Sequence, residues 1–199
     1  MTRQTAPPRR RTALVTGCNS GIGFETARAL FEHDWHLIVH CRTERNAEAT
    51  AATLRGHHPG GRLETVAFEL GDLRAVDRAA RLLLQRHTAL DLLVNNAGAV
   101  FRTRTLTADG LEAHFGVNYL AGHLFTNRML PLLQAAAPSR IVNVSSVTHR
   151  IGRIRFDDLQ HERGFHWLKA YGASKLAVLC GTYALARRLA DSRVTVNAV

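Results

Sequence analysis

The chain has 199 residues, of which 46% are hydrophobic and 21% are charged, and this balance is typical of a globular domain with a sizeable core. The formal net charge of +10 comes mainly from arginines scattered along the sequence, so it indicates a basic surface rather than a nucleic-acid interface. No apolar run reaches the roughly 18 residues that span a bilayer, although a basic surface is compatible with peripheral membrane contact. Three cysteines without a CxxC spacing argue against a disulfide framework and fit the reducing cytoplasm.

Short apolar runs alternate along the chain with longer stretches of helical periodicity. Residues 1–11 are polar and basic without the apolar segment of a secretory signal, and we expect a disordered leader before a domain over 12–199. Strands are predicted at residues 12–16, 35–40, 63–68, 90–95, 140–145 and 193–199. Helices are predicted near residues 21–33, 43–55, 73–88, 107–135 and 168–191. This alternation predicts a Rossmann-type α/β fold, a doubly wound parallel sheet between two helical layers.

Two further features concern the carboxyl-terminal half. Residues 149–166 form the longest irregular stretch, directly before the last predicted helix. The chain ends inside the sixth predicted strand, which would leave an apolar sheet edge uncovered. We therefore expect that the sequence is the incomplete part of a longer domain.

A glycine-rich turn follows the first predicted strand and precedes a helix. Gly17, Gly21 and Gly23 have the spacing Gly-x-x-x-Gly-x-Gly. Glycines allow the backbone to approach a pyrophosphate closely, and the helix N-terminus offers free amides and partial positive charge. The turn predicts a dinucleotide site, and a purely structural turn is the alternative.

The end of the second predicted strand indicates which dinucleotide would bind. An acidic residue there would hydrogen-bond the adenosine ribose of NAD and repel the extra phosphate of NADP. Cys41 ends this strand and Arg42 follows it, with no acid in place. Since guanidinium groups suit phosphate, the sequence favours NADP over NAD, with a solvated Arg42 as the alternative.

The eleven histidines raise the question of a metal site. His161 and His166 are five residues apart, so on a helix their rings would diverge. We assign no metal from the sequence.

Tyr171 and Lys175 lie four residues apart in the last predicted helix. Residues with this spacing share a helix face, and a nearby cation favours the phenolate form of tyrosine. The pair therefore suits proton transfer to or from a bound substrate. A partly exposed tyrosine beside a solvated lysine is the alternative.

Taken together, these residues resemble the short-chain dehydrogenase/reductase family over about 12–199. The family's motifs occur in order at residues 16–23, 72–73, 95–98, 115–119, 145–146 and 171–175. The resemblance implies these cofactor contacts: Gly17, Asn19, Ser20, Gly21, Ile22, Arg42, Asp72, Leu73, Asn95, Tyr171 and Lys175. In this assignment Asp72 and Leu73 contact the adenine, and Asn95 lies against the cofactor. The implied catalytic residues are Asn118, Ser146, Tyr171 and Lys175.

The resemblance also implies a reaction mechanism. Tyr171 would give a proton to the carbonyl oxygen as hydride arrives, or take it back in oxidation. Lys175 would favour the phenolate and hold the nicotinamide ribose hydroxyls. Ser146 would orient the substrate oxygen, and Asn118 would hold a water that links Lys175 to solvent.

Within the family the chain is most similar to the retinol dehydrogenase-like group, on residues 39–42, 114–123 and the interval 146–171. This likeness implies an NADP(H)-dependent oxidoreductase acting on small apolar alcohols or carbonyls, and a homo-oligomer. In the family the sixth strand precedes a Pro-Gly turn, a substrate-covering segment and a seventh strand, none of which this sequence contains. The alternative functions are a truncated, non-catalytic dinucleotide-binding protein and, on net charge alone, a nucleic-acid-binding protein.

Overall fold

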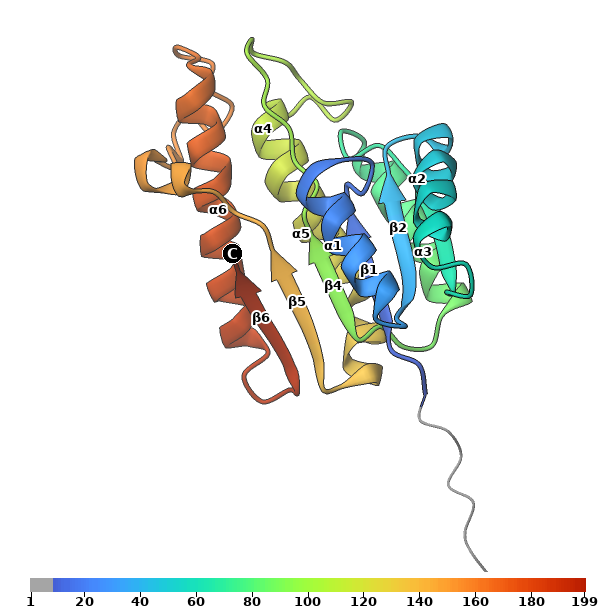
Figure 1. Cartoon of the computed structure of the whole chain (residues 1–199). Helices are drawn as coiled ribbons and strands as arrows, with labels where there is room; N and C mark the ends of the chain where they lie inside the picture. Colours follow the sequence, from blue (N-terminus) through green and yellow to red (C-terminus); the bar gives the residue numbers. More distant parts are fainter. Residues whose placement is uncertain (1–8) are drawn as a thin grey trace, which may run out of the picture.

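Six parallel strands form one central sheet in the computed structural model, which describes residues 9–199. The strands are β1 (Thr12–Thr16), β2 (His36–Cys41), β3 (Leu63–Ala67), β4 (Leu92–Asn95), β5 (Ser139–Asn143) and β6 (Val194–Ala198). Their order across the sheet is β3-β2-β1-β4-β5-β6, and every pairing is parallel (Figure 1). The predicted Rossmann-type doubly wound sheet is confirmed.

Helices cover both faces of this sheet. They are α1 (Gly21–Glu32), α2 (Glu44–His57), α3 (Leu73–Arg86), α4 (Ala113–Phe115), α5 (Ala121–Ala136) and α6 (Trp167–Arg188), with a π-helical turn η1 (Gly116–Leu120) and a 3₁₀ turn η2 (Val147–Ile151). Helices α1 and α2 pack on one face, and α3, α5 and α6 pack on the other. The molecule therefore has three layers, with the sheet in the middle.

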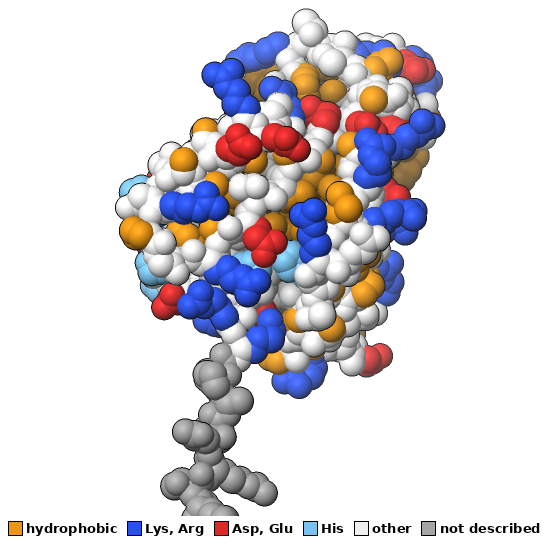
Figure 2. Space-filling model, turned by 90° about the vertical axis from the view of Figure 1, so that its right-hand side faces the viewer, with side chains coloured by type: hydrophobic (Ala, Val, Ile, Leu, Met, Phe, Trp, Pro, Cys, Tyr) orange, Lys and Arg blue, Asp and Glu red, His pale blue; other side chains and the backbone are white. Residues whose placement is uncertain are grey.

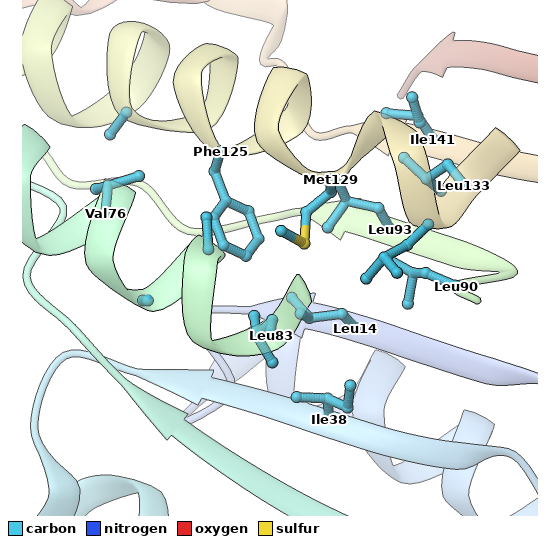
Figure 3. Packing of buried hydrophobic residues seen from close by; sticks show 14 of the residues in the cluster. Leu14, Ile38, Val76, Leu83, Leu90, Leu93, Phe125, Met129, Leu133 and Ile141 are labelled. Atoms are coloured by element: carbon cyan, nitrogen blue, oxygen red, sulfur yellow. The ribbon is translucent and has the colours of Figure 1, made fainter. Parts of the chain in front are cut away.

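Successive residues of the central strands contribute to opposite faces, as the pleat requires. Leu14 of β1 and Ile38 of β2 belong to the core under α3 and α5, which also contains Leu83 and Phe125 (Figure 3). Their neighbours, among them Val15, belong to the core under α1 and α2. All residues of β1 and β2 are buried, which explains why residues 13–15 and 37–39 are apolar without the alternation of a half-buried strand.

The strand order reverses between β1 and β4. The chain runs from β1 outward to β2 and β3, then returns to place β4 on the other side of β1. The loops after β1 and β4 consequently diverge, and a crevice opens at the carboxyl ends of these strands. In open parallel sheets this switch point is where ligands bind.

The fourth predicted helix, at 107–135, is wrong at its start. Residues 107–111 form a turn in which Thr107 N–H donates to the Leu111 carbonyl over 2.8 Å, and Gly110 has a positive φ of 75°. Glu112 then caps α4 by accepting from the N–H groups of His114 and Phe115. Leu106 and Glu112 pair across this turn as an isolated antiparallel bridge, so the segment is extended rather than helical before α4.

Two further predictions concern the amino-terminal leader and the absence of a membrane-spanning segment. Residues 1–8 of the predicted leader lie outside the described residues. Arg9 forms an ion pair with Asp91, and the Arg11 guanidinium lies 4.3 Å from the centre of the Trp35 ring. Within residues 9–199, no helix combines the length and the apolar character needed to cross a membrane.

Candidate active site

The predicted glycine turn lies at the switch point of the sheet, between β1 and α1. Gly17 has a positive φ of 73°, and a β-carbon there would lie 2.9 Å from Ala97 Cα. A β-carbon on Gly23 would lie 2.2 Å from the Gly17 carbonyl oxygen and 2.3 Å from Asn96 Nδ2. Both positions therefore require glycine, because helix α1 begins in direct contact with the turn that precedes it.

The segment after β4 braces the glycine turn. Asn96 Nδ2 donates to the carbonyl oxygens of Thr16 and Gly17 over 2.8 and 3.2 Å. The Thr16 hydroxyl accepts from the N–H groups of Asn96 and Ala97, each over 3.0 Å. Two adjacent strands thus hold the turn in one conformation.

His40 of β2 supports the turn from the other side. Its carbonyl accepts from the N–H groups of Gly17 and Cys18 over 3.0 Å. Its ring Nδ1 lies 3.3 Å from the Gly17 N–H, and Nε2 lies 3.0 Å from the Phe68 carbonyl oxygen. Burial lowers the pKa of His40 to about 4, so the ring is neutral at physiological pH and Nδ1 can accept.

A cleft of about 680 Å³ opens at the glycine turn. Its lining includes the predicted cofactor residues Gly17, Asn19, Ser20, Ile22 and Arg42. Ser20 is the N-cap of α1, yet its side chain makes no capping hydrogen bond, and the first turn of α1 contains no acidic residue. The amides that begin α1 are therefore available for an anion.

Arg42 lies at the mouth of this cleft. Its side chain is 72% exposed, and its Nε lies 3.9 Å from a carboxylate oxygen of Glu69, which also lines the cleft. An exposed pair at this distance interacts weakly in water. The Arg42 guanidinium is therefore free to turn toward a phosphate.

Asp72 and Leu73, the predicted adenine contacts, lie at the start of α3. Asp72 is the N-cap of this helix, where one carboxylate oxygen accepts from the N–H groups of Arg74 and Ala75 over 2.8 and 3.0 Å. Leu73 packs against the core, while Glu69 and Leu70, three residues earlier, line the cleft. The adenine contacts of Asp72 and Leu73 stay a prediction.

Asn95, another predicted cofactor contact, is held by two side chains. Its Nδ2 donates to Thr126 Oγ1 over 2.7 Å and to Asn143 Oδ1 over 2.8 Å, under the helices α5 and α6. Asn96 lines the cleft. Adjacent residues at the end of a strand point to opposite faces, so the two asparagine side chains have different partners, and the cofactor contact of Asn95 stays a prediction.

Tyr171 and Lys175 lie one turn apart on α6, as predicted. Lys175 Nζ lies 5.7 Å from the centre of the Tyr171 ring and donates to the Val144 carbonyl over 3.0 Å. Lys175 is buried, and this desolvation lowers its pKa. Among the described residues, the Tyr171 hydroxyl has no hydrogen-bond partner, so it is free to form a hydrogen bond with a substrate.

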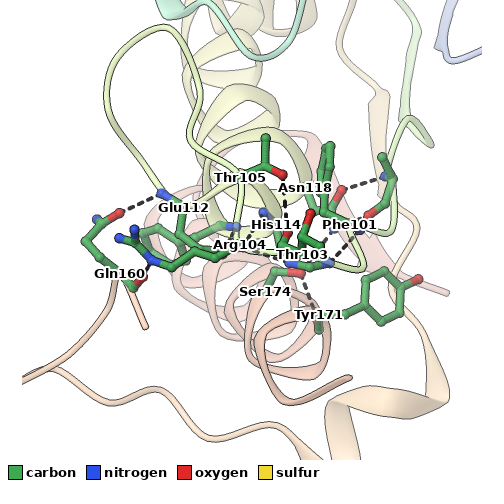
Figure 4. Close-up of polar contacts among 12 residues, drawn as sticks. Phe101, Thr103, Arg104, Thr105, Glu112, His114, Asn118, Gln160, Tyr171 and Ser174 are labelled. Carbon is green, nitrogen blue, oxygen red and sulfur yellow. Dashed lines mark hydrogen bonds and ion pairs between the residues drawn. The ribbon is translucent and has the colours of Figure 1, made fainter. Parts of the chain in front are cut away.

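Asn118 approaches Lys175 at Gly98. A β-carbon on Gly98 would lie 3.2 Å from Asn118 Oδ1 and 3.4 Å from Lys175 Nζ, so the two side chains meet at this glycine. Asn118 accepts from Ala99 N–H over 2.8 Å and donates to Ala99 O and Ser174 Oγ over 3.0 and 3.3 Å (Figure 4). The side chain thus ties the loop after β4 to α6, and the water relay remains a prediction.

The π-helical turn η1 places Asn118 in this position. Residues Gly116–Leu120 form the only such turn in the part of the chain that the structure describes. Turns of this kind inside α-helices occur frequently at functional sites, because the extra residue changes the direction of the side chains. Helical periodicity alone does not indicate it.

Ser146 follows β5 and begins the 3₁₀ turn η2. Its hydroxyl oxygen accepts from the hydroxyl and the N–H of Thr148, over 2.9 and 3.3 Å. These contacts orient the side chain and leave its own hydrogen free to donate. The neighbouring Ser145 instead donates to the Lys175 carbonyl over 3.0 Å. The two serines are therefore not equivalent, and Ser146 is the one suited to a substrate oxygen.

A buried pair that the sequence analysis missed, Glu112 and His114, lies beside Tyr171. A carboxylate oxygen of Glu112 lies 2.8 Å from His114 Nδ1, and His114 Nε2 accepts from Phe101 N–H over 2.9 Å (Figure 4). Burial alone would raise the pKa of Glu112, but hydrogen bonds from the side chain and backbone of His114 outweigh it and lower this pKa. The His114 ring packs edge-on against Tyr171, with 5.9 Å between the ring centres.

These observations fit a dinucleotide. The cleft is large, its floor carries glycines that a β-carbon would obstruct, and the amides at the start of α1 have no side-chain cap. Lys175, which lies one helical turn from Tyr171, and Asn118 both approach Gly98, which lines the same cleft. The residues present can therefore hold a phosphate at one end and a reacting ring near Tyr171.

Comparison with known proteins identifies relatives of this arrangement. Residues 11–199 match the family model described as short chain dehydrogenase. The chain is 40% identical over 190 residues to "Retinol dehydrogenase 13" from Homo sapiens, covering 95% of this chain and 57% of that protein. It is 42% identical over 197 residues to "Retinol dehydrogenase 14" from Mus musculus, covering 94% and 59%. The chain thus spans less than two thirds of the length of these relatives.

Solved structures show the same architecture. An uncharacterised protein from Mycobacterium Paratuberculosis superimposes with a TM-score of 0.83 at 38% identity, over 94% of this chain and 66% of that one. The "RhlG/NADP active-site complex" from Pseudomonas aeruginosa superimposes with a TM-score of 0.77 at 28% identity, over 94% and 70%. The layered sheet is thus shared with a protein whose structure was solved with NADP.

Proposed function

Because the chain belongs to the short-chain dehydrogenase family, we propose that it is part of an NADP(H)-dependent oxidoreductase that acts on an apolar alcohol or carbonyl compound. The observation that carries this proposal is the free hydroxyl of Tyr171, one helical turn from buried Lys175 and beside the switch-point cleft. The similarity to retinol dehydrogenases supports the substrate class.

Each proposed role follows from a contact of this chain. The bound nicotinamide would supply or accept the hydride. The Tyr171 hydroxyl donates a proton to the carbonyl oxygen in reduction and removes it in oxidation. Lys175, held by the Val144 carbonyl, places a positive charge next to the Tyr171 ring and favours the phenolate. Ser146 donates a hydrogen bond to the substrate oxygen, and Thr148 keeps its hydroxyl in place.

Arg42 supports NADP as the cofactor. It lies at the cleft mouth directly after β2, where its exposed guanidinium can pair with the additional phosphate. Asp72 and Leu73 remain our proposed adenine contacts, and Glu69 and Leu70 are further candidates because they line the same cleft as Arg42.

Exposed apolar side chains support an apolar substrate. Val147, directly after Ser146, is 70% exposed, and Ile151 at the end of η2 is 55% exposed. The turn η2 packs against α6, which carries Tyr171. These apolar side chains are open to water beside the proposed catalytic serine. Their burial against a hydrocarbon chain would lower the free energy of the complex with substrate.

The test is turnover of NADPH with a series of apolar aldehydes. Tyr171→Phe should lower kcat by about 100-fold or more, since general acid catalysis is lost, while the Kd for NADPH stays unchanged. Tyr183→Phe, on the same helix and 59% exposed, is the matched control and should retain full activity. Retained turnover in Tyr171→Phe would contradict the assignment.

A further inference from the structure

Three side chains outside the candidate active site meet at the amino-terminal edge of the sheet. They are His36 at the start of β2, Glu64 in β3 and His87, the C-cap of α3. His36 Nε2 lies 2.6 Å from Glu64 Oε1, and His87 Nε2 lies 3.3 Å from Glu64 Oε2. The three ligand atoms all lie within 4.8 Å of one another.

The fold explains why these residues converge. Glu64 is paired with Ile38 in the register of β2 and β3, so the two side chains share a face, and His36 is two residues before Ile38 on that face. Ile38 packs in the same core as Leu83 of α3. Helix α3 covers this face and ends at His87, which brings the second imidazole to the carboxylate.

Both imidazoles lack a hydrogen-bond partner within residues 9–199. The side chains of His36 and His87 are only 7% and 10% exposed, and their Nε2 atoms are buried without a hydrogen bond. The Glu64 oxygen near His36 lies off the direction of a ring N–H bond, so the close approach is not a well-formed hydrogen bond. Buried polar atoms are normally satisfied, so the two nitrogens indicate a ligand between them.

We propose that His36, Glu64 and His87 bind one Zn²⁺ ion, with water in the fourth position. Two imidazoles and one carboxylate are a known zinc donor set, and imidazole favours Zn²⁺ over Mg²⁺ and Ca²⁺. Ligand atoms of a tetrahedral zinc site lie about 3.3 Å apart, given metal–ligand distances of about 2.0–2.1 Å. The 3.3 Å separation between His87 and Glu64 matches this value, and the 2.6 Å separation between His36 and Glu64 is shorter, so a side-chain rotation that moves these two atoms apart completes the site.

The proposed site has an entry path. The Glu64 side chain is 35% exposed, which leaves one side of the cluster open to water. Figure 2 looks onto the side of the molecule formed by α2 and α3, where histidine and acidic side chains lie next to one another among basic ones. An ion can therefore reach the cluster without local unfolding.

The ion would stabilise the fold without taking part in the reaction. The cluster lies at the amino-terminal ends of β2 and β3, whereas the cleft lies at the carboxyl ends of the strands. It would join two strands to the end of α3, three segments that are distant in sequence. A ligand that binds only the folded chain raises the free energy of unfolding, so zinc should raise the melting temperature.

The test is a titration of the whole chain, without a polyhistidine tag and after chelation of metals, with ZnCl₂ in a calorimeter. We expect one Zn²⁺ per chain, a higher Tm, and intense visible absorption when Co²⁺ replaces Zn²⁺ in a tetrahedral site. His36→Gln and His87→Gln should each raise the Kd for Zn²⁺ by more than about tenfold and abolish the cobalt spectrum. His57→Gln on α2 and Cys180→Ser, both exposed, are controls that should bind as the wild type does.

Folding of each variant is checked separately by circular dichroism and by NADPH affinity, which should stay unchanged. Glu64→Gln provides a second test at nearly constant side-chain size, and it should also lose zinc. The proposal is overturned if the wild type binds no stoichiometric zinc at micromolar concentration. Wild-type affinity in the folded His36, Glu64 and His87 variants would overturn it as well.

Discussion

At the scale of single residues, the direction of a side chain decides its function. Asn95 and Asn96 are adjacent and chemically identical, but Asn95 bonds to Thr126 and Asn143 beneath α5 while Asn96 holds the glycine turn. The same holds for Ser145, which bonds to the Lys175 backbone, and Ser146, whose hydrogen is free. A motif therefore identifies a pair of adjacent residues, and the contacts of each side chain decide which structural role it has.

The proposed cofactor preference rests on one residue and can be tested there. Arg42→Gln should raise the Kd for NADPH by about tenfold or more, because a charge-assisted contact to phosphate is lost, and should change the Kd for NADH little. Both constants are measured by fluorescence titration. Arg45→Gln, exposed in the first turn of α2, is the matched control and should affect neither constant. Equal losses for both cofactors in Arg42→Gln would contradict a role in phosphate binding.

At the scale of elements, the structure differs from the predicted secondary structure mainly at helix ends and at one irregular turn. Asp72 has the sequence context of a binding residue, yet its carboxylate caps α3. Glu112 similarly ends a turn and begins α4, where periodicity predicts a continuous helix from 107 onward. The π-helical turn η1 then inserts a change of direction that places Asn118 against Ala99 and Ser174.

The capping role of Asp72 leads to a second prediction. Asp72→Ala should lower the free energy of unfolding by about 1 kcal/mol, because two N–H groups of α3 lose their acceptor. Urea unfolding measures this loss. Asp72→Asn keeps a good capping residue and should have the stability of the wild type. An unchanged free energy of unfolding in Asp72→Ala would contradict the capping role, and a large loss of NADPH affinity in both variants would support the predicted adenine contact.

At the scale of the whole molecule, the active site depends on distant segments that the sheet brings together. His40 of β2 illustrates this, since its backbone and ring both hold Gly17 while Nε2 reaches the Phe68 carbonyl after β3. Protonation of Nδ1 would remove an acceptor from the glycine turn. Stability and cofactor binding are therefore coupled through one buried ring.

This coupling predicts a pH dependence. Burial lowers the pKa of His40 from 6.5 to about 4, so between these values the unfolded chain binds more protons than the folded chain. The stabilisation is fully present above about pH 6.5 and is lost as the pH falls toward 4, by up to about 3 kcal/mol. Urea unfolding at a series of pH values measures it. His40→Gln should flatten the profile in this window relative to the wild type and to His33→Gln, an exposed control. Identical slopes in all three proteins would refute the prediction.

Much of the fold and part of the site could be predicted from the sequence for a physical reason. The alternation of apolar runs with amphipathic stretches reflects burial of strands between two helical layers, so it specifies the parallel sheet directly. Tyr171 and Lys175 were correctly paired because helical spacing alone places them on one face. The glycines at 17 and 23 were recognisable because close approach of the backbone excludes every side chain there.

Only the tertiary structure decided which residues of a motif face the cleft and which distant residues meet. Glu69 and Asn96 line the cleft, and His114, which is bonded to Glu112, packs against Tyr171 from a distant segment of the chain. The meeting of His36, Glu64 and His87 likewise depends on strand register and on the length of α3. Secondary structure can be predicted because it depends on neighbouring residues. A site is formed by segments that are distant in sequence, so its geometry exists only once the sheet has formed.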